Sequence, residues 1–252
     1  MLTPVTLILG LGRDVGTACA RHFQDKNHHV VIAAPDEDII ERAQDELDKA
    51  VTAHHGALNT MIGIRNAFNA ALEAHQRIDN LVVIPAVPEP LSLMEVDLEA
   101  FDESLIRDAR MSTLVLRLFA EEVREQAPLV SDGPDRQRQA GTVTFVLSLS
   151  ARLATPGKFT ESVSQAGIEG VVQAGAIELA EQMIRVNAVS AIRPRAEKSE
   201  LWLKARTPLK RAALADEIAE AVGFLASPGA AIITGETLIM DGGRLQLGGT
   251  LD

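Results

Sequence analysis

Short apolar segments alternate with helical segments along nearly the whole chain, and this alternation leaves few folds open. The chain begins with a strand at Val5–Leu9, a helix at Val15–Phe23 and a second strand at His29–Ala34. A strand, a helix and a following strand form a βαβ unit whose two strands are parallel. Repetition of this unit predicts an α/β fold, in which helices cover both faces of a parallel sheet.

The same pattern continues to the end of the chain. Further strands are expected at residues 53–60, Asn80–Ile84, Thr142–Leu147, Arg185–Val189 and Glu236–Met240. Further helices are expected at Glu37–Lys49, Gly63–His75, Leu98–Gln126, Glu161–Met183 and Leu214–Ala226. Asp36 is suited to cap the helix at Glu37. Residues 127–141 are expected to form an exposed loop and residues 192–211 an irregular polar segment. No repeat or linker divides the chain, so residues 1–252 are expected to form one domain.

Composition excludes several kinds of partner. The net charge of −11 disfavours nucleic acid and anionic membranes as partners. No apolar run reaches the roughly 18 residues that a membrane span needs, and no signal peptide is recognised, so a cytoplasmic protein is expected. Cys19 is the only cysteine, and it is expected to be a buried, inert thiol. The adjacent pairs His28-His29 and His54-His55 would point to opposite faces, so no metal site is expected.

Several motifs in the second half of the chain resemble one enzyme family. The motifs are Ile184–Val189 (IRVNAV), Pro208–Arg211 followed by Asp216–Ala219, Gly223–Ser227 (GFLAS), Ile233–Gly235 (ITG) and Met240–Gly243 (MDGG). Together they resemble the short-chain dehydrogenase/reductase family over almost the whole chain. The resemblance implies a Rossmann-type doubly wound parallel sheet of about seven strands. It also implies a dimer or tetramer, and NAD(P)-dependent oxidoreductase chemistry on a carbonyl or alcohol substrate.

The family's cofactor turn, TGxxxGxG, is altered here. Its first and last glycines match Gly10 and Gly16, but Asp14 stands at the middle glycine. Glycine lets the pyrophosphate approach a helix N-terminus, whereas a carboxylate fills that space and repels phosphate. Asp14 is also placed to cap the helix. Gly12 offers an alternative turn that resembles other dinucleotide-binding turns, and Arg13 offers a compensating charge.

Other positions that contact the cofactor in the family are changed as well. Ala34 and Pro35 stand where many members carry an Asp for NAD or an Arg for NADP. The family's NNAG stretch aligns with residues 83–86, where Ala86 remains but both amide side chains are lost. The resemblance therefore implies no NAD(P) binding, or only weak binding, and does not say which of the two nucleotides would be used.

The chain contains no tyrosine, although the family's catalytic set is an Asn, a Ser, a Tyr and a Lys. These positions align with Asp108, Ser148, Glu161 and Gln165. A glutamate is normally ionised at neutral pH and is a poor acid, and a glutamine can hydrogen-bond a ribose but supplies no charge. Ser148 has an alternative reading as an ordinary strand-end serine. Lys158 is expected to be a solvated surface residue.

Three functions stay open at this point. The first is a degenerate member without standard hydride transfer, acting as a structural or regulatory subunit in a homo-oligomer or beside an active homologue. The second is an active oxidoreductase in which Glu161 is the acid and Ser148 polarises a carbonyl. The third is a small-molecule binding protein or a non-redox enzyme that keeps the cleft. Any oligomer is expected to form through the two long helices, Leu98–Gln126 and Glu161–Met183.

Overall fold

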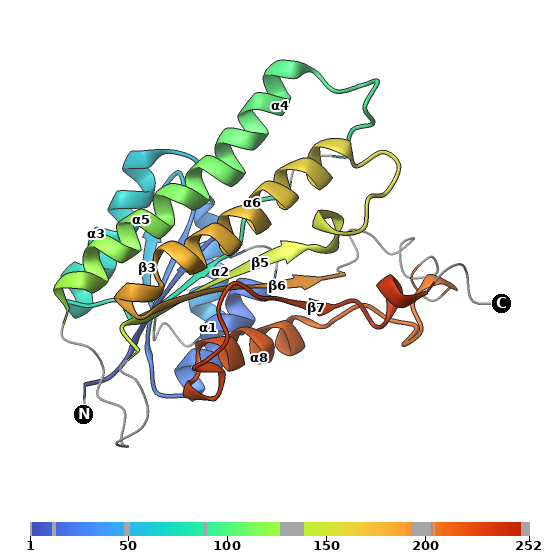
Figure 1. The fold of residues 1–252 in the computed structure, drawn as a ribbon. Coiled ribbons are helices and arrows are strands. Elements are labelled where there is room, and N and C mark those ends of the chain that lie inside the picture. Colours follow the sequence, from blue (N-terminus) through green and yellow to red (C-terminus); the bar gives the residue numbers. More distant parts are fainter. Residues whose placement is uncertain are drawn as a thin grey trace.

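A computed structural model describes residues 2–11, 14–47, 51–87, 90–126, 139–192, 203 and 205–247. Seven parallel strands form one sheet in the order β3-β2-β1-β4-β5-β6-β7, with helices on both faces (Figure 1). The predicted α/β fold is therefore confirmed. The strands are β1 (Val5–Leu9), β2 (His29–Ala34), β3 (Thr52–His55), β4 (Asn80–Val83), β5 (Gly141–Ser148), β6 (Ile184–Ala191) and β7 (Thr237–Met240). The helices are α1 (Val15–Asp25), α2 (Glu37–Glu46), α3 (Met61–His75), α4 (Leu98–Leu105), α5 (Met111–Glu125), α6 (Phe159–Glu178) and α8 (Ala215–Ala226).

Several predicted boundaries were wrong. The helix expected over 98–126 contains one wider π-helical turn, Ile106–Arg110, between α4 and α5. Helix α6 begins two residues earlier than predicted, at Phe159, and ends at Glu178. Helix α2 ends at Glu46 rather than Lys49, and β3 is shorter than the predicted 53–60. Most of the loop predicted at 127–141 and most of the segment 192–211 lie outside the described residues.

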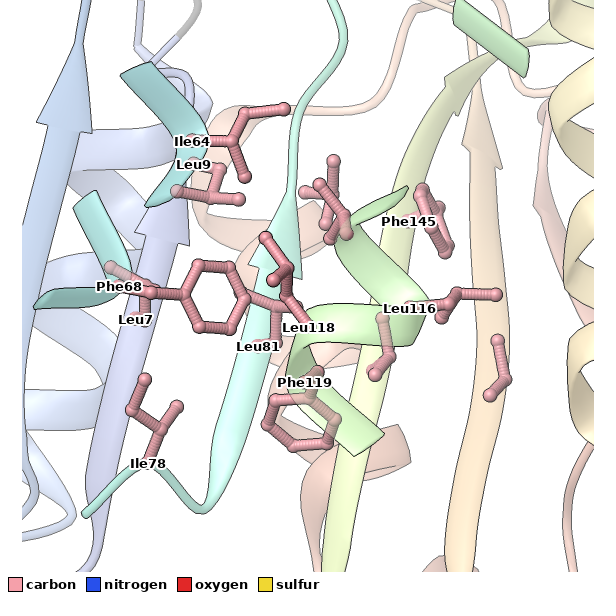
Figure 2. Close-up of a cluster of buried hydrophobic side chains, with 14 of the residues drawn as sticks. Leu7, Leu9, Ile64, Phe68, Ile78, Leu81, Leu116, Leu118, Phe119 and Phe145 are labelled. Carbon is pink, nitrogen blue, oxygen red and sulfur yellow. The ribbon is translucent and has the colours of Figure 1, made fainter. Parts of the chain in front are cut away.

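Two apolar cores hold the helices against the sheet. Helices α3, α5 and α6 cover one face, where Phe119 and Phe145 are fully buried in the larger cluster (Figure 2). Helices α1, α2 and α8 cover the other face, and Cys19 of α1 is fully buried there as predicted. Because both faces of the sheet are covered, the central strands β1, β4 and β5 are buried almost throughout.

The strand order places one crevice at the carboxyl edge of the sheet. Strand β1 pairs with β2 on one side and with β4 on the other, so the chain leaves these strands in opposite directions. Ligands of open α/β sheets bind outside the carboxyl ends of the strands at such a reversal. The fold therefore directs the search for a site to the residues after Leu9, Val83 and Ser148.

A buried polar network closes the opposite edge of the sheet. The Asp79 carboxylate accepts hydrogen bonds from the Val5 backbone N–H (2.8 Å) and from the Arg77 guanidinium (2.9 Å). Beside it, the Thr6 hydroxyl lies 2.9 Å from His28 Nδ1. Burial lowers the pKa of His28, which favours the neutral imidazole.

Among the described residues, no helix is both long and apolar enough to cross a membrane.

Candidate active site

A cleft of about 1080 Å³ opens at the carboxyl edge of the sheet. Its floor is formed where strands end, by Gly10 after β1, Ile84 after β4, Ser148 of β5 and Ala191 of β6. This volume lies just above the usual range of about 300–1,000 Å³ for small-molecule sites. The cleft that the fold predicts is thus present and large enough for a ligand of substantial size.

One end of the cleft carries a compact cluster of oxygen atoms. The Ser148 and Ser150 hydroxyls lie 2.7 and 2.6 Å from Glu161 Oε1, and they lie 2.7 Å from each other. Ser148 ends β5, Ser150 follows it in a 3₁₀ turn, and Glu161 lies in the first turn of α6. The side chain of Glu161 is only 1% exposed, although it contributes to the cleft wall. The position aligned with the family's tyrosine thus holds a buried carboxyl group bonded to two hydroxyls.

Lys158 also belongs to this cluster, so its prediction as a solvated surface residue was wrong. Its ammonium nitrogen lies 3.2 Å from Glu161 Oε2 and 3.3 Å from Oε1. Because α6 starts at Phe159, Lys158 is the residue that precedes the first turn, and residues three apart lie on the same side of a helix. Its side chain is one-third exposed and lines the cleft. A lysine thus reaches the site from a position seven residues before the one the family uses.

A second ion pair lines the same end of the cleft. Asp108, aligned with the family's asparagine, has a fully buried side chain in the π-helical turn. The neighbouring Arg107 donates to its carboxylate (3.0 Å) and to the Ser104 hydroxyl (2.7 Å). Sequence reasoning missed Arg107, because adjacent residues do not face each other in a regular α-helix. The change from amide to carboxylate is therefore matched by a cation.

Gln165 replaces the family's lysine in a structural role. Its side-chain oxygen accepts a hydrogen bond from the Ser148 backbone N–H (2.9 Å), and the residue is 1% exposed. Its amide nitrogen has no hydrogen-bond partner among the described residues. Gln165 is not one of the described residues that line the cleft. It therefore fixes the end of β5 against α6 and supplies no charge to the cleft.

The glycines of the phosphate turn are explained by packing. Gly10 has a φ of +83°, and a Cβ there would collide with the Ile84 carbonyl oxygen. A Cβ at Gly16 would collide with the backbone of Leu11, whose carbonyl accepts the Gly16 N–H (2.8 Å). Such collisions forbid a side chain whether or not a nucleotide binds, so these two glycines are not evidence for one.

Asp14 lies in the cleft wall at the N-terminus of α1. Its side chain makes no capping hydrogen bond to α1, so the prediction that it caps this helix was wrong. Asp36, in contrast, caps α2 as predicted by accepting from the backbone N–H of Asp38 (3.0 Å). Gly12 and Arg13, the predicted alternative turn and compensating charge, lie outside the described residues.

These residues do not fit a nicotinamide dinucleotide in the way the family holds it. Asp14 places a carboxylate where the pyrophosphate would lie, at the helix end that otherwise attracts anions. Ala34, Pro35 and Ala86 line the cleft without a side chain that could hydrogen-bond a ribose or an amide. Gln165 is engaged with Ser148.

An ion pair fixes the segment at the mouth of the cleft. Arg211, which lines the cleft, donates two hydrogen bonds to the Glu217 carboxylate, at 2.7 and 2.6 Å. These bonds, with one from the Leu214 backbone N–H, lower the pKa of Glu217 to about 2.

Among the described residues, no three His, Cys, Asp or Glu side chains are placed to hold a metal ion.

Comparison with known proteins gives a consistent family. Residues 10–244 match the profile of a family described as Enoyl-(Acyl carrier protein) reductase. Dehydrogenase/reductase SDR family member 4 of Bos taurus is 28% identical over 96% of this chain and 87% of its own. Short-chain dehydrogenase srdC of Neurospora crassa is 31% identical over 71% of this chain and 72% of its own.

Solved structures resemble this fold over nearly its full length. The crystal structure of gox2181 covers 98% of this chain and 97% of its own, with a TM-score of 0.85 at 22% identity. The 3-ketoacyl-(acyl-carrier-protein) reductase from Brucella melitensis, crystallised with NADH, has a TM-score of 0.84 at 27% identity. It covers 96% of this chain and 98% of its own.

Proposed function

The chain belongs to the short-chain dehydrogenase/reductase family, a family of oxidoreductases, and on that premise we propose that it binds a small molecule in the family's cleft without standard hydride transfer. In this proposal the active site is degenerate with respect to the tyrosine–lysine chemistry, and the cleft is kept for another ligand. The proposal concerns this chain alone and not its relatives.

One observation carries the proposal: the position of the tyrosine is filled by Glu161, bonded to Ser148 and paired with Lys158. A tyrosine hydroxyl donates a proton from a group whose free pKa is near 10, and a carboxylate paired with an ammonium group accepts one instead. The usual proton donor for carbonyl reduction is therefore replaced by a proton acceptor.

The retained cleft supports ligand binding over a purely structural role. A protein without a ligand gains by filling an apolar cavity, because each unfilled volume forfeits packing contacts. Here about 1080 Å³ stays open, with apolar walls from Leu58, Ile64 and Val115 and a polar end at Ser148 and Lys158. A few polar groups in a mainly apolar cleft are typical of small-molecule sites.

A titration with NADH and NADPH, followed by nucleotide fluorescence, tests the loss of cofactor binding. We expect no saturable binding to the wild type in the micromolar range. Asp14→Asn removes the charge at the phosphate position, and we expect tighter NADH binding by about tenfold, equivalent to about 1.4 kcal/mol. Asp25→Asn, at the opposite end of the same helix, is the matched control and should leave binding unchanged.

Two results would contradict the proposal. One is micromolar NADH or NADPH binding by the wild type. The other is nucleotide oxidation with a panel of carbonyl compounds that disappears in Glu161→Gln, which would instead support an active oxidoreductase with Glu161 as the acid. A thermal-shift screen of small molecules other than nucleotides should find ligands that raise the Tm of the wild type. The same ligands should raise the Tm of Ser148→Ala by less.

A role as a partner subunit is a second candidate, favoured by the outer face of α5 and α6. Gly170 has open space around its Cα, and Ile177 is 77% exposed. A groove of about 430 Å³ between the two helices is lined by apolar residues, among them Leu116 and Val171, and by charged residues, among them Arg117 and Glu178. Small and apolar residues on a helix face permit close packing of a second chain. We expect a dimer or tetramer by light scattering, and dissociation in Gly170→Arg. A wild-type monomer would refute this candidate.

A further inference from the structure

We propose that Ser148, Ser150, Glu161 and Lys158 form an acid–base site that moves a proton at the carbon next to a ketone carbonyl, with Glu161 as the base. The reaction is redox-neutral and needs no nucleotide. The inference rests on the proposed function, because it assigns a ligand class and a reaction to the same cleft.

The oxygen cluster has fewer hydroxyl protons than oxygen–oxygen contacts. Three oxygen atoms, from Ser148, Ser150 and Glu161, lie in mutual contact at 2.6–2.7 Å, which are hydrogen-bond distances for all three pairs. With an ionised carboxylate, only the two hydroxyl protons are available for three contacts. One more proton on Glu161 would complete a ring of three hydrogen bonds. The cluster therefore has a hydrogen-bonding position for one more proton on Glu161, whose Oε1 also lies 3.3 Å from the Lys158 ammonium nitrogen.

The ammonium group of Lys158 lies beside the Glu161 carboxylate. Lys158 lies 3.2 Å from Glu161 Oε2 and its one-third exposed side chain lines the cleft, so a ligand can contact the ammonium group, beside which the 1% exposed Glu161 forms part of the cleft wall. Removal of a proton next to a carbonyl makes an enolate, whose negative charge collects on the oxygen. A fixed cation or hydroxyl donor near that oxygen stabilises the charge. The site thus offers a base and an electrophile side by side.

The proposed step balances without a further reagent. The Glu161 carboxylate takes the proton from the α-carbon, and the electron pair of that C–H bond forms the carbon–carbon double bond of the enolate. The carbonyl π electrons move to the oxygen, which accepts a hydrogen bond from the Lys158 ammonium group. The return step delivers the proton to the same carbon or to a conjugated one. Nothing is oxidised or reduced.

Acyl transfer by Ser148 is the rival chemistry for the same atoms. Ser148 has a base within 2.7 Å, which is one feature of an activated nucleophile. However, its hydroxyl oxygen already accepts from the Ser150 backbone N–H (3.3 Å) and from the Ser150 hydroxyl. No histidine is among the described residues that line the cleft. A carboxylate alone is too weak a base to favour deprotonation of an aliphatic hydroxyl, whereas carboxylates do serve as bases for enolisation.

The charges of the cleft indicate a neutral ligand. Three of the cations that line the cleft, Arg107, Lys158 and Arg211, are each paired with a carboxylate, respectively Asp108, Glu161 and Glu217, and a fourth, Lys210, is exposed. A neutral ligand leaves these pairs intact, whereas an anion must compete with a carboxylate. Because most of the lining is apolar, we infer a neutral ketone with a large apolar body.

Exchange of deuterium from D₂O into added ketones, followed by proton NMR without nucleotide, tests the inference. The probes are cyclohexanone, 2-tetralone and 2-decanone. We expect the wild type to accelerate exchange into at least one probe over a buffer blank. Glu161→Gln should lower the enzymatic rate about hundredfold or more, in the range that general acid–base groups contribute. Lys158→Met should lower it less, and the rate in the wild type should fall as carboxylates become protonated at acid pH.

Glu169→Gln is the matched control. Glu169 lies on the same helix and pairs with Arg152 at 2.6 Å, but it is outside the cleft lining, so this variant should keep the wild-type rate. If Glu161→Gln fails to fold, Lys158→Met and the pH profile still test the site. Absence of exchange with all three probes, or exchange that both variants leave unchanged, would overturn the inference. Nucleotide binding measured separately decides the proposed function, so the two can fail independently.

Discussion

Replacement of Lys158 by methionine is expected to destabilise the protein through the carboxylate it leaves behind. Methionine keeps the length and apolar stem of the side chain and removes only the charge. Across 3.2 Å, two unit charges attract by about 1 kcal/mol at the dielectric constant of water and by about 5 kcal/mol at an effective value of 20. Lys158 is one-third exposed, so solvent screening reduces the gain, and we expect a loss of about 1–2 kcal/mol at pH 7.

Thermal denaturation of four proteins measures this loss as a double-mutant cycle. For a domain of this size, 1–2 kcal/mol corresponds to a fall in Tm of about 2–8 °C in Lys158→Met. In the Glu161→Gln background the buried carboxylate that Lys158 pairs with is gone, so the same replacement should change Tm by about 1 °C or less. Equal effects in the two backgrounds would refute the reasoning, because they would show that Lys158 acts without Glu161.

Three further predictions follow from single positions. Gly10→Ala should cost about 2–4 kcal/mol in a denaturant titration, because a φ of +83° and a collision with a carbonyl oxygen act together. The pKa of Glu217 is lowered from an ordinary 4.5 to about 2, so the ionised carboxylate adds stability above pH 4.5. This stability is lost as the pH falls through 2. In pH-dependent melts, Glu217→Gln should remove this part of the acid sensitivity. Burial lowers the pKa of His28, so its neutral form adds stability above pH 6.5 that is lost on acidification; His28→Asn should flatten the change in Tm between pH 7 and pH 5.

The fold was predictable from the sequence because it depends on patterns that many residues share. The alternation of apolar strands with helices fixes parallel strands, and both apolar faces must then be covered. Even the place of the cleft follows, since Gly10, Ile84 and Ser148 each come directly after or at the end of a predicted strand. The alignment also brought Ser148 and Glu161 together, and they are in hydrogen-bond contact.

The site was less predictable because its chemistry depends on single boundaries. A helix start at Glu161 leaves Lys158 in a loop, whereas a start at Phe159 turns it toward Glu161. The spacing of three residues between a lysine and a glutamate was the available signal. Arg107 and Asp108 gave no such signal, because their contact needs the wider π-helical turn, which sequence periodicity does not reveal.

The glycines explain why a family pattern and its chemistry can separate. Gly10 and Gly16 are required by the Ile84 carbonyl and the Leu11 backbone, so they persist for as long as the fold does. Asp14 and Glu161, in contrast, line the cleft, so the residue types at these two positions bear on ligand binding. A motif can contain both residues that packing requires and residues that contact the ligand. The residues required by packing indicate the fold, and the residues that contact the ligand indicate the function. In this chain the two glycines tied to packing, Gly10 and Gly16, are kept, whereas Asp14 and Glu161 stand where the family has a glycine and a tyrosine, and the proposed change of ligand rests on this difference.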